Sequence, residues 1–244
     1  MAATLLYGSI AVAEMRVWED TSGKQVKARF DRELFGSVEL RRPDGSLYSI
    51  PLENLSPQDL RYLRTRIPPE IEIEVRTLKR EKERNKNATR SEFEQFSDEI
   101  EVVTANVLIR QKSSADFEGA LRAEIYFIGR EVATPEIYRL SAKSTAQVRL
   151  TEENQRKFAF GSSADFRIYE EYNKDTRGAD YVGYLVVVLD AMGKKLKTRT
   201  NVSWLDEDEK IDALRKFYVD AFFDANCRKR SVPRPSYYDA RNEF

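Results

Sequence analysis

The alternation of apolar and polar residues predicts short β-strands in the first quarter of the chain. Val26, Ala28 and Phe30 lie two positions apart, which places them on one face of a strand. The segment 43–45 (Pro-Asp-Gly) is a hairpin-turn signal, and the residues after it alternate again. Five short strands within ~55 residues predict a small barrel. The clearest of them are expected at 16–18, 25–30, 38–40 and 47–52.

A short helix is expected at the end of this barrel. Ser56 has the character of an N-cap residue, and Pro57 occupies the first helical turn, where a missing amide hydrogen costs nothing. Asp59 follows the cap by three residues, where its carboxylate meets free backbone amides.

A double proline at 68–69 separates the barrel from a second unit with longer strands. Consecutive strands without intervening helices predict an antiparallel β-sandwich of the immunoglobulin-like class. The expected strands are 70–78, 99–110, 120–130, 136–140, 147–150, 157–160, 166–172, 181–190 and 194–203. Turns are expected at 161–163 and 177–178, among other places. A C-terminal helix is expected over 206–223, because Ile211, Leu214, Tyr218 and Phe222 follow helical spacing.

The two ends of the chain carry their own signals. Residues 1–13 are mildly apolar and end in Ala11-Val12-Ala13, which resembles a signal-peptidase site and predicts export. An apolar N-terminal strand of a cytoplasmic protein is the alternative. The predicted organisation is therefore a signal peptide at 1–13, a barrel at 14–67, a sandwich with its helix at 68–227 and a basic, then polar tail at 228–244. Within the second unit, the stretch 79–90 has the charge pattern of a solvated linker.

Composition narrows the possible functions. The 244 residues carry 41 basic and 41 acidic side chains, so the whole-chain basic character typical of a nucleic-acid binder is missing. No segment is long and apolar enough to be expected to cross a membrane. The absence of His excludes catalysis and metal binding that depend on imidazole. Cys227 is the only cysteine, which excludes an internal disulfide and a cysteine-cluster metal site. We expect no cofactor, no metal and no enzymatic activity.

Two further features have ordinary explanations. The acidic run 206–209 lacks the spaced oxygens and the glycine of a calcium loop, and acids at a helix N-terminus are favoured by the helix dipole. The basic residues 228–230 beside Cys227 would lower the pKa of its thiol if they lay close to it, but no second cysteine or His supports a nucleophile.

The first unit resembles a known family. The segments 16–20, 23–24, 26–30, 38–45, 50–52 and 55–59 occur in an order similar to the first homology domain of the fungal endocytic adaptor Sla-one. This resemblance implies an SH3-like barrel without catalytic activity that recognises short peptides of the Asn-Pro-Phe-x-Asp type. In the second unit, 123–129 and 181–190 are similar to segments that accompany this domain in bacterial secreted proteins of unknown function.

The resemblance also implies a site. The family's basic residue before the Asx-Gly turn, which meets the peptide's aspartate, matches Arg42, where this chain has Arg instead of the usual Lys. Arg41, Tyr48 and Lys27 are the other expected peptide-binding residues. The leading hypothesis is a non-enzymatic, exported, adaptor-like module that binds a protein or an acidic peptide. The alternative is a structural or assembly component of a cell envelope with no open groove. A carboxylate-only glycosidase has no candidate pair of acids.

Overall fold

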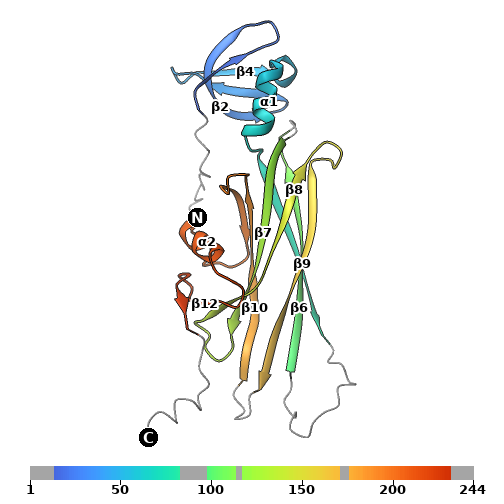
Figure 1. Cartoon of the computed structure of the whole chain (residues 1–244), viewed down its shortest axis with the longest axis vertical. Helices are drawn as coiled ribbons and strands as arrows, with labels where there is room; N and C mark the ends of the chain where they lie inside the picture. Colours follow the sequence, from blue (N-terminus) through green and yellow to red (C-terminus); the bar gives the residue numbers. More distant parts are fainter. Residues whose placement is uncertain (1–13, 83–97, 114–116, 171–175, 232–244) are drawn as a thin grey trace, which may run out of the picture. The chain divides into compact units, whose positions relative to one another are not determined.

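A computed structural model of the chain describes residues 14–82, 98–113, 117–170 and 176–231. The predicted signal peptide at 1–13, most of the predicted linker at 79–90 and most of the predicted tail lie outside the described residues. The chain is mainly β, as the sequence predicts, and the described residues form a four-stranded sheet, a larger sheet and two α-helices (Figure 1).

Two compact units make up the structure. The first consists of Met1–Glu72, Arg110–Ala120 and Arg149–Phe158, and the second of Ile73–Ile109, Leu121–Val148 and Ala159–Phe244. The first unit thus takes in two segments from the region that the sequence assigns to the sandwich. Independent folding on either side of the double proline at 68–69 stays a prediction.

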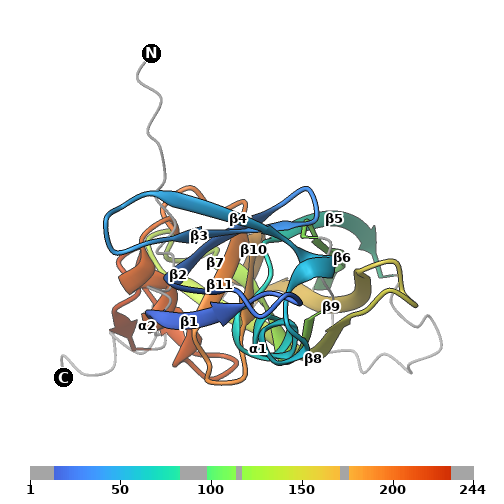
Figure 2. The same ribbon diagram turned by 90° about the horizontal axis from the view of Figure 1, so that it is seen from above.

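The first unit contains an antiparallel sheet in which sequence neighbours pair. Its strands are β1 (Arg16–Glu19), β2 (Gln25–Leu34), β3 (Ser37–Arg41) and β4 (Leu47–Pro51), in the order β1-β2-β3-β4 (Figure 2). After β4 the chain forms a single 3-10 turn, η1 (Leu52–Asn54), and then returns to β1 through an isolated bridge between Leu55 and Asp20. This return replaces the fifth strand expected from the sequence and connects the two edges of the sheet.

Alternation along these strands separates a buried face from an outer face. The buried face forms the core of the unit, which comprises Trp18, Ala28, Val38, Leu40, Ile50, Leu55 and Leu63. Trp18 is fully buried, and its indole N–H donates to the carbonyl of Ala28 at 3.1 Å. Trp18 is therefore part of the core and is not available to stack on a ligand.

The helix α1 (Pro57–Arg66) begins as predicted. The side chain of Ser56 accepts a hydrogen bond from the backbone N–H of Asp59 at 3.1 Å. The buried carboxylate of Asp59 pairs with Arg16 and also accepts the N–H of Glu19 at 2.6 Å. The guanidinium of Arg16 lies 3.7 Å from the ring centroid of Tyr62. Asp59 thus does more than the cap that the sequence predicts, because it fastens α1 to β1.

The larger sheet has the path β13-β12-β8-β7-β10-β9-β6-β5, with β11 added on β10. Its strands are β5 (Ile71–Glu81), β6 (Asp98–Gln111), β7 (Phe117–Glu131), β8 (Tyr138–Leu150), β9 (Lys157–Glu170), β10 (Thr176–Leu189), β11 (Lys195–Thr200), β12 (Phe222–Phe223) and β13 (Lys229–Arg230).

The strand β10 changes partners along its length, which produces the sandwich arrangement. Thr176–Gly178 pairs with β9, whereas the residues from Ala179 onward pair with β7. At the change, Gly178 has a φ of +106°, and a Cβ there would overlap the carbonyl oxygen of Arg167. Only glycine fits this position. The sequence signal read as a turn at 177–178 is therefore the point where a continuous strand changes partner.

The helix α2 (Asp208–Arg215) covers one face of the second unit (Figure 1). Ile211 and Leu214 join a core cluster with Tyr126, Leu185 and Phe223. The helix is much shorter than the predicted 206–223. After Arg215 the chain turns, and the N–H of Asp220 donates to the carbonyl of Leu140 at 2.7 Å, so that the following residues pair with β8.

Long-range pairing also joins strands that the sequence separates. The predicted strands 136–140 and 147–150 are parts of one strand, β8, which begins at Tyr138, and 157–160 and the described part of 166–172 belong to β9. The expected turn at 161–163 is extended backbone, and Ser162 lies there with its hydroxyl donating to that of Ser144 at 2.8 Å. Polar and small residues therefore mark a strand interior here.

Candidate functional site

The outer face of β1 to β4 carries basic residues beside exposed apolar ones. The register pairs Val17 with Lys27, Arg29 with Arg41, and Arg41 with Leu47. Val17 and Leu47 are each about half exposed, at 51% and 50%. We call this set, together with Met15, the cationic face. Such a mixture on a sheet surface is suited to contact with a molecule that is partly apolar and partly acidic.

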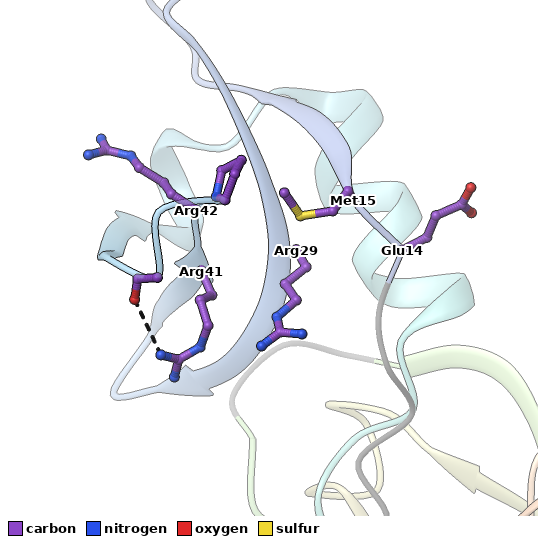
Figure 3. Close-up of a pocket in the computed structure, with 7 residues that line it drawn as sticks. Glu14, Met15, Arg29, Arg41 and Arg42 are labelled. Carbon is purple, nitrogen blue, oxygen red and sulfur yellow. Dashed lines mark hydrogen bonds between the residues drawn. The ribbon is translucent and has the colours of Figure 1, made fainter.

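An open pocket of about 400 Å³ lies on the cationic face (Figure 3). It is lined by Glu14, Met15, Arg29, Arg41, Arg42, Pro43 and Gly45. The lining comes from the segment leading into β1, from β2, and from the end of β3 with its turn. The turn at 42–45 is closed by the N–H of Gly45, which donates to the carbonyl of Arg42 at 3.0 Å.

The guanidinium of Arg41 is held by an acid of the same sheet. Its Nε and Nη2 donate to the two carboxylate oxygens of Asp31 at 2.9 and 3.1 Å, and its Nη1 to the carbonyl of Gly45 at 3.4 Å. A β-bulge in β2 between Phe30 and Arg32 leaves Asp31 without a partner in the register. The hydrogen bonds to Asp31 raise the pKa of Arg41 above its ordinary value, so its charge is permanent and matched.

Two neighbouring cations on β2 lack such an acid. The side chains of Lys27 and Arg29 are exposed, and within the described residues neither forms an ion pair. In Figure 3 the side chains of Arg29 and Arg41 extend in the same direction, with Met15 beside Arg29, while Glu14 extends away from them. The positive charge of Arg29 is thus available to an external anion.

Arg42 lies at the rim and is engaged with an aromatic ring. Its guanidinium carbon is 4.6 Å from the ring centroid of Tyr48, and the ammonium of Lys24 is 5.2 Å from the same centroid. Tyr48 is half-buried, with its ring packed against the core of the unit. Two cations close to one ring form a second positive site, which is stabilised by the negative face of the aromatic system.

The acidic residue of the 42–45 turn, Asp44, is hydrogen-bonded to a neighbouring residue. The carboxylate of Asp44 accepts hydrogen bonds from the N–H and the hydroxyl of Ser46 at 2.9 and 2.6 Å. These bonds, that of the hydroxyl first, lower the pKa of Asp44, so it stays ionised within its own turn.

The structure places two of the four expected site residues on the cationic face and two at its rim, where the half-buried ring of Tyr48 also packs against the core. Lys27 and Arg41 lie on the face, and Arg42 contacts Tyr48 at the rim. Sequence reasoning missed Arg29, although the core positions Val26, Ala28 and Phe30 imply that the residues between them point outward. Met15 and Asp31 were missed as well. The position of Met15 depends on how the start of β1 lies, and that of Asp31 depends on the bulge in β2.

In the second unit, the most conspicuous charged cluster is buried. The carboxylate of Glu124 accepts the hydroxyl of Tyr126 at 2.6 Å and Nε of Arg215 at 3.1 Å, and Arg122 lies 3.2 Å away. Burial acts to raise the pKa of Glu124, but the hydrogen bonds from Tyr126 and Arg215 outweigh it and lower the value. This cluster attaches α2 to β7 and leaves no room for a ligand, because Glu124 and Tyr126 are buried.

The single thiol does not have the environment of a nucleophile. Cys227 is buried, and burial raises its pKa to about 11, so the thiol is protonated at neutral pH. The neighbouring basic residues at 228–230 are exposed and do not counteract this effect. In the part of the chain that the structure describes, no group of three or more acidic or cysteine side chains is arranged to hold a metal ion.

None of the described helices is both long enough and apolar enough to span a bilayer.

Comparison with known proteins assigns the chain to no family. No family model matches it, and no curated protein matches. Among solved structures, a Northeast Structural Genomics Consortium target is 12% identical, with 53% of this chain and 84% of that chain covered and a TM-score of 0.23. A β-D-glucoside glucohydrolase from Trichoderma reesei is 14% identical over 55% of this chain and 19% of its own, with a TM-score of 0.25. A protein from Akkermansia muciniphila is 13% identical over 64% and 81%, with a TM-score of 0.23. These similarities are too low to support a functional argument.

Proposed function

We propose that this protein is a non-enzymatic, adaptor-like module that binds short acidic segments of other proteins on the cationic face of its first unit. The observation that carries the proposal is the open pocket on this face, where Arg29, which has no ion pair with any described residue, lies beside exposed apolar side chains. Each charged side chain on the surface of a sheet is ordinarily surrounded by water. Here Arg29, Arg41 and Arg42 together line a concave surface.

Two kinds of contact are available to a bound peptide. Lys27 and Arg29 offer charge to acidic side chains, and Met15, Val17 and Leu47 offer apolar area. Complementary charge steers the encounter and fixes the orientation of the ligand, while the apolar contacts supply affinity. The resemblance of residues 15–65 to a peptide-recognising domain agrees with this use of the surface.

The chemistry of the chain supports binding rather than catalysis. The sequence has no His to act as a general base near neutral pH. The one thiol is kept protonated by burial. The buried carboxylate of Glu124 is occupied by hydrogen bonds from Tyr126 and Arg215.

Export is part of the proposal and rests on the sequence alone. The apolar segment 1–13 with its Ala11-Val12-Ala13 ending supports processing after Ala13. N-terminal sequencing of the protein from its native source tests this, and an intact Met1 on most molecules would contradict it.

Peptide titrations test the binding function. Fluorescent acidic peptides, including Asn-Pro-Phe-Ser-Asp, are titrated with the full chain and with Arg42→Glu, which reverses a charge at the rim of the pocket. We expect binding by the wild type and a loss of about tenfold in affinity for the variant. Arg61→Glu is the matched control, because Arg61 is an exposed residue of α1 outside the pocket lining. If no peptide binds to the wild type, the envelope-component alternative takes first place.

A further inference from the structure

We propose that Arg29, rather than Arg42, receives the carboxylate of the bound peptide, and that Met15 and Pro43 receive an apolar group next to that carboxylate. The inference rests on the proposed function and specifies the chemistry of its site. It concerns a residue that neither the charge pattern nor the resemblance singles out.

The position of Arg29 suits it to this role. It belongs to the lining of the pocket, its side chain is exposed, and within the described residues no carboxylate is close enough to pair with it. A guanidinium presents parallel N–H groups that match the two oxygens of a carboxylate. A ligand carboxylate at this position would gain hydrogen bonds without displacing an acid of the protein.

The neighbouring Arg41 is not equivalent to it. Both edges of its guanidinium are used, since Asp31 accepts from Nε and Nη2 and the carbonyl of Gly45 accepts from Nη1. A second carboxylate would have to approach a pair whose charge is already matched by Asp31. Arg41 therefore lines the pocket beside Arg29, with its guanidinium held in place by Asp31 and Gly45.

Arg42 is turned away from the pocket centre. Its guanidinium rests on the ring of Tyr48 at 4.6 Å, and Figure 3 shows its side chain extending away from those of Arg29 and Arg41. A ligand acid bound by Arg42 would lie at the rim, in water, where screening weakens an ion pair. The effect of Arg42 on binding is thus expected to be a general charge effect.

The apolar side of the pocket defines the rest of the ligand. Met15 is 39% exposed, and Pro43 is also exposed, so both offer apolar area next to Arg29. A methionine side chain adapts its shape to different apolar groups. The ligand class is therefore a carboxylate next to an apolar group. The carboxylate belongs either to an acidic side chain or to a free chain terminus.

Three labelled peptides separate these cases. The first is acetyl-Asn-Pro-Phe-Ser-Asp-amide, the second replaces its Asp with Asn, and the third is the Asn peptide with a free C-terminal acid. The full chain and its variants Arg29→Gln, Arg42→Gln and Lys27→Gln are titrated with each. Thermal unfolding of each variant shows whether it remains folded.

We expect the wild type to prefer the Asp peptide to the Asn peptide, and Arg29→Gln to lose roughly tenfold affinity for the Asp peptide and under twofold for the Asn peptide. Arg42→Gln should weaken both peptides to a similar, smaller extent. If the wild type prefers the Asn peptide with the free C-terminal acid to the Asn amide, and Arg29→Gln loses this preference, Arg29 receives the carboxylate of a chain terminus.

Two results would overturn the inference in different ways. If Arg42→Gln or Lys27→Gln abolishes the preference for a carboxylate while Arg29→Gln keeps it, Arg29 is not the receiving residue, and the proposed function stands. If none of the three peptides binds to the folded wild type, the inference and the proposed function both fail. An Arg29→Gln protein that unfolds is replaced by Arg29→Lys, which should retain part of the preference.

Discussion

The outer face of the four-stranded sheet and the helix-covered face of the second unit differ in whether their charged side chains are paired. Under α2, the carboxylate of Glu124 has the hydroxyl of Tyr126 and the guanidinium of Arg215 as partners, and both Glu124 and Tyr126 are buried. On the cationic face, Arg41 has its acid, but Lys27 and Arg29 have none among the described residues.

The cost of burying a charge explains this difference. A carboxylate removed from water must be paired and hydrogen-bonded, so the sequence has to supply a partner for Glu124. An exposed cation keeps its water and needs no partner within the protein. The unpaired cations Lys27 and Arg29 are therefore tolerated on the open surface, where they also remain available to a ligand.

The largest expected effect comes from a closely packed glycine of the second unit. Replacement of Gly178 by Ala should lower the free energy of unfolding by more than about 3 kcal/mol, because the added Cβ meets the backbone of Arg167 and the φ of +106° is strained for Ala. Gly45→Ala is the matched control in the open region. Gly45 also has a positive φ, +85°, but no atom lies within 4 Å of its Cβ position. We expect that change to cost about 1–2 kcal/mol. Urea denaturation measures the free energy of unfolding of both variants. Equal losses would show that the close packing around Gly178 does not add to the cost of the substitution.

Breaking the buried cluster is expected to have the next largest effect. Glu124→Gln removes the charge that faces Arg215, and the loss should be about 2–4 kcal/mol in the free energy of unfolding. Arg29→Gln, on the open surface, should change stability by no more than about 0.5 kcal/mol. Denaturation of the two variants side by side checks the comparison directly. A small loss for Glu124→Gln would mean that α2 is held by its apolar contacts alone.

Two acids of β7 should give opposite dependences of stability on pH. The pKa of Glu124 is lowered below its ordinary 4.5, so its stabilisation is present above that value and is lost as the pH falls through the folded-state pKa. Burial raises the pKa of Glu131, against a hydrogen bond from the N–H of Gly178. Its contribution is therefore full below 4.5 and is lost as the pH rises through the folded-state pKa.

Stability measured from about pH 3 to about pH 8 tests these signs. At neutral pH Glu131→Gln should be more stable than the wild type and Glu124→Gln less stable, and both differences should shrink on acidification. Differences of the same sign for the two variants would be inconsistent with the distinct environments of the two carboxylates.

The smallest expected effect concerns the pair on the cationic face. Asp31→Asn removes the charge that matches Arg41 and should strengthen binding of an acidic peptide about threefold at low salt, with little change in stability. The gain should fall as salt is added, because exposed charges are screened. Affinity for the matching Asn-containing peptide serves as the control and should stay constant. A loss of affinity would show that Asp31 is needed to shape the pocket.

Local signals predicted the secondary structure well where local physics decides it. The alternation around Ala28 placed the core of β2, and Ser56 and Pro57 marked the start of α1. The same kind of signal failed at 161–163, where small and polar residues continue through β9, and after Arg215, where backbone pairing with β8 ends the helix. In both places a partner far away in the sequence supplies the hydrogen bonds.

The candidate site was predicted only in part for a similar reason. A basic residue before a turn is visible in the sequence, and so Arg42 was expected. That Arg41 is neutralised by Asp31 depends on a bulge, and that Met15 borders the same pocket as Arg29 depends on how the end of β1 lies against β2.

The sequence by itself determined that the chain is mainly β, that Val26, Ala28 and Phe30 share one face of a strand, and that chemistry based on His or paired cysteines is excluded. These properties follow from composition and from the two-residue period of a strand, which need no knowledge of distant contacts. Only the tertiary structure decided which cations are matched by acids and which are not. Ion pairs depend on distances between side chains on different strands, and the register and bulges of the sheet set those distances.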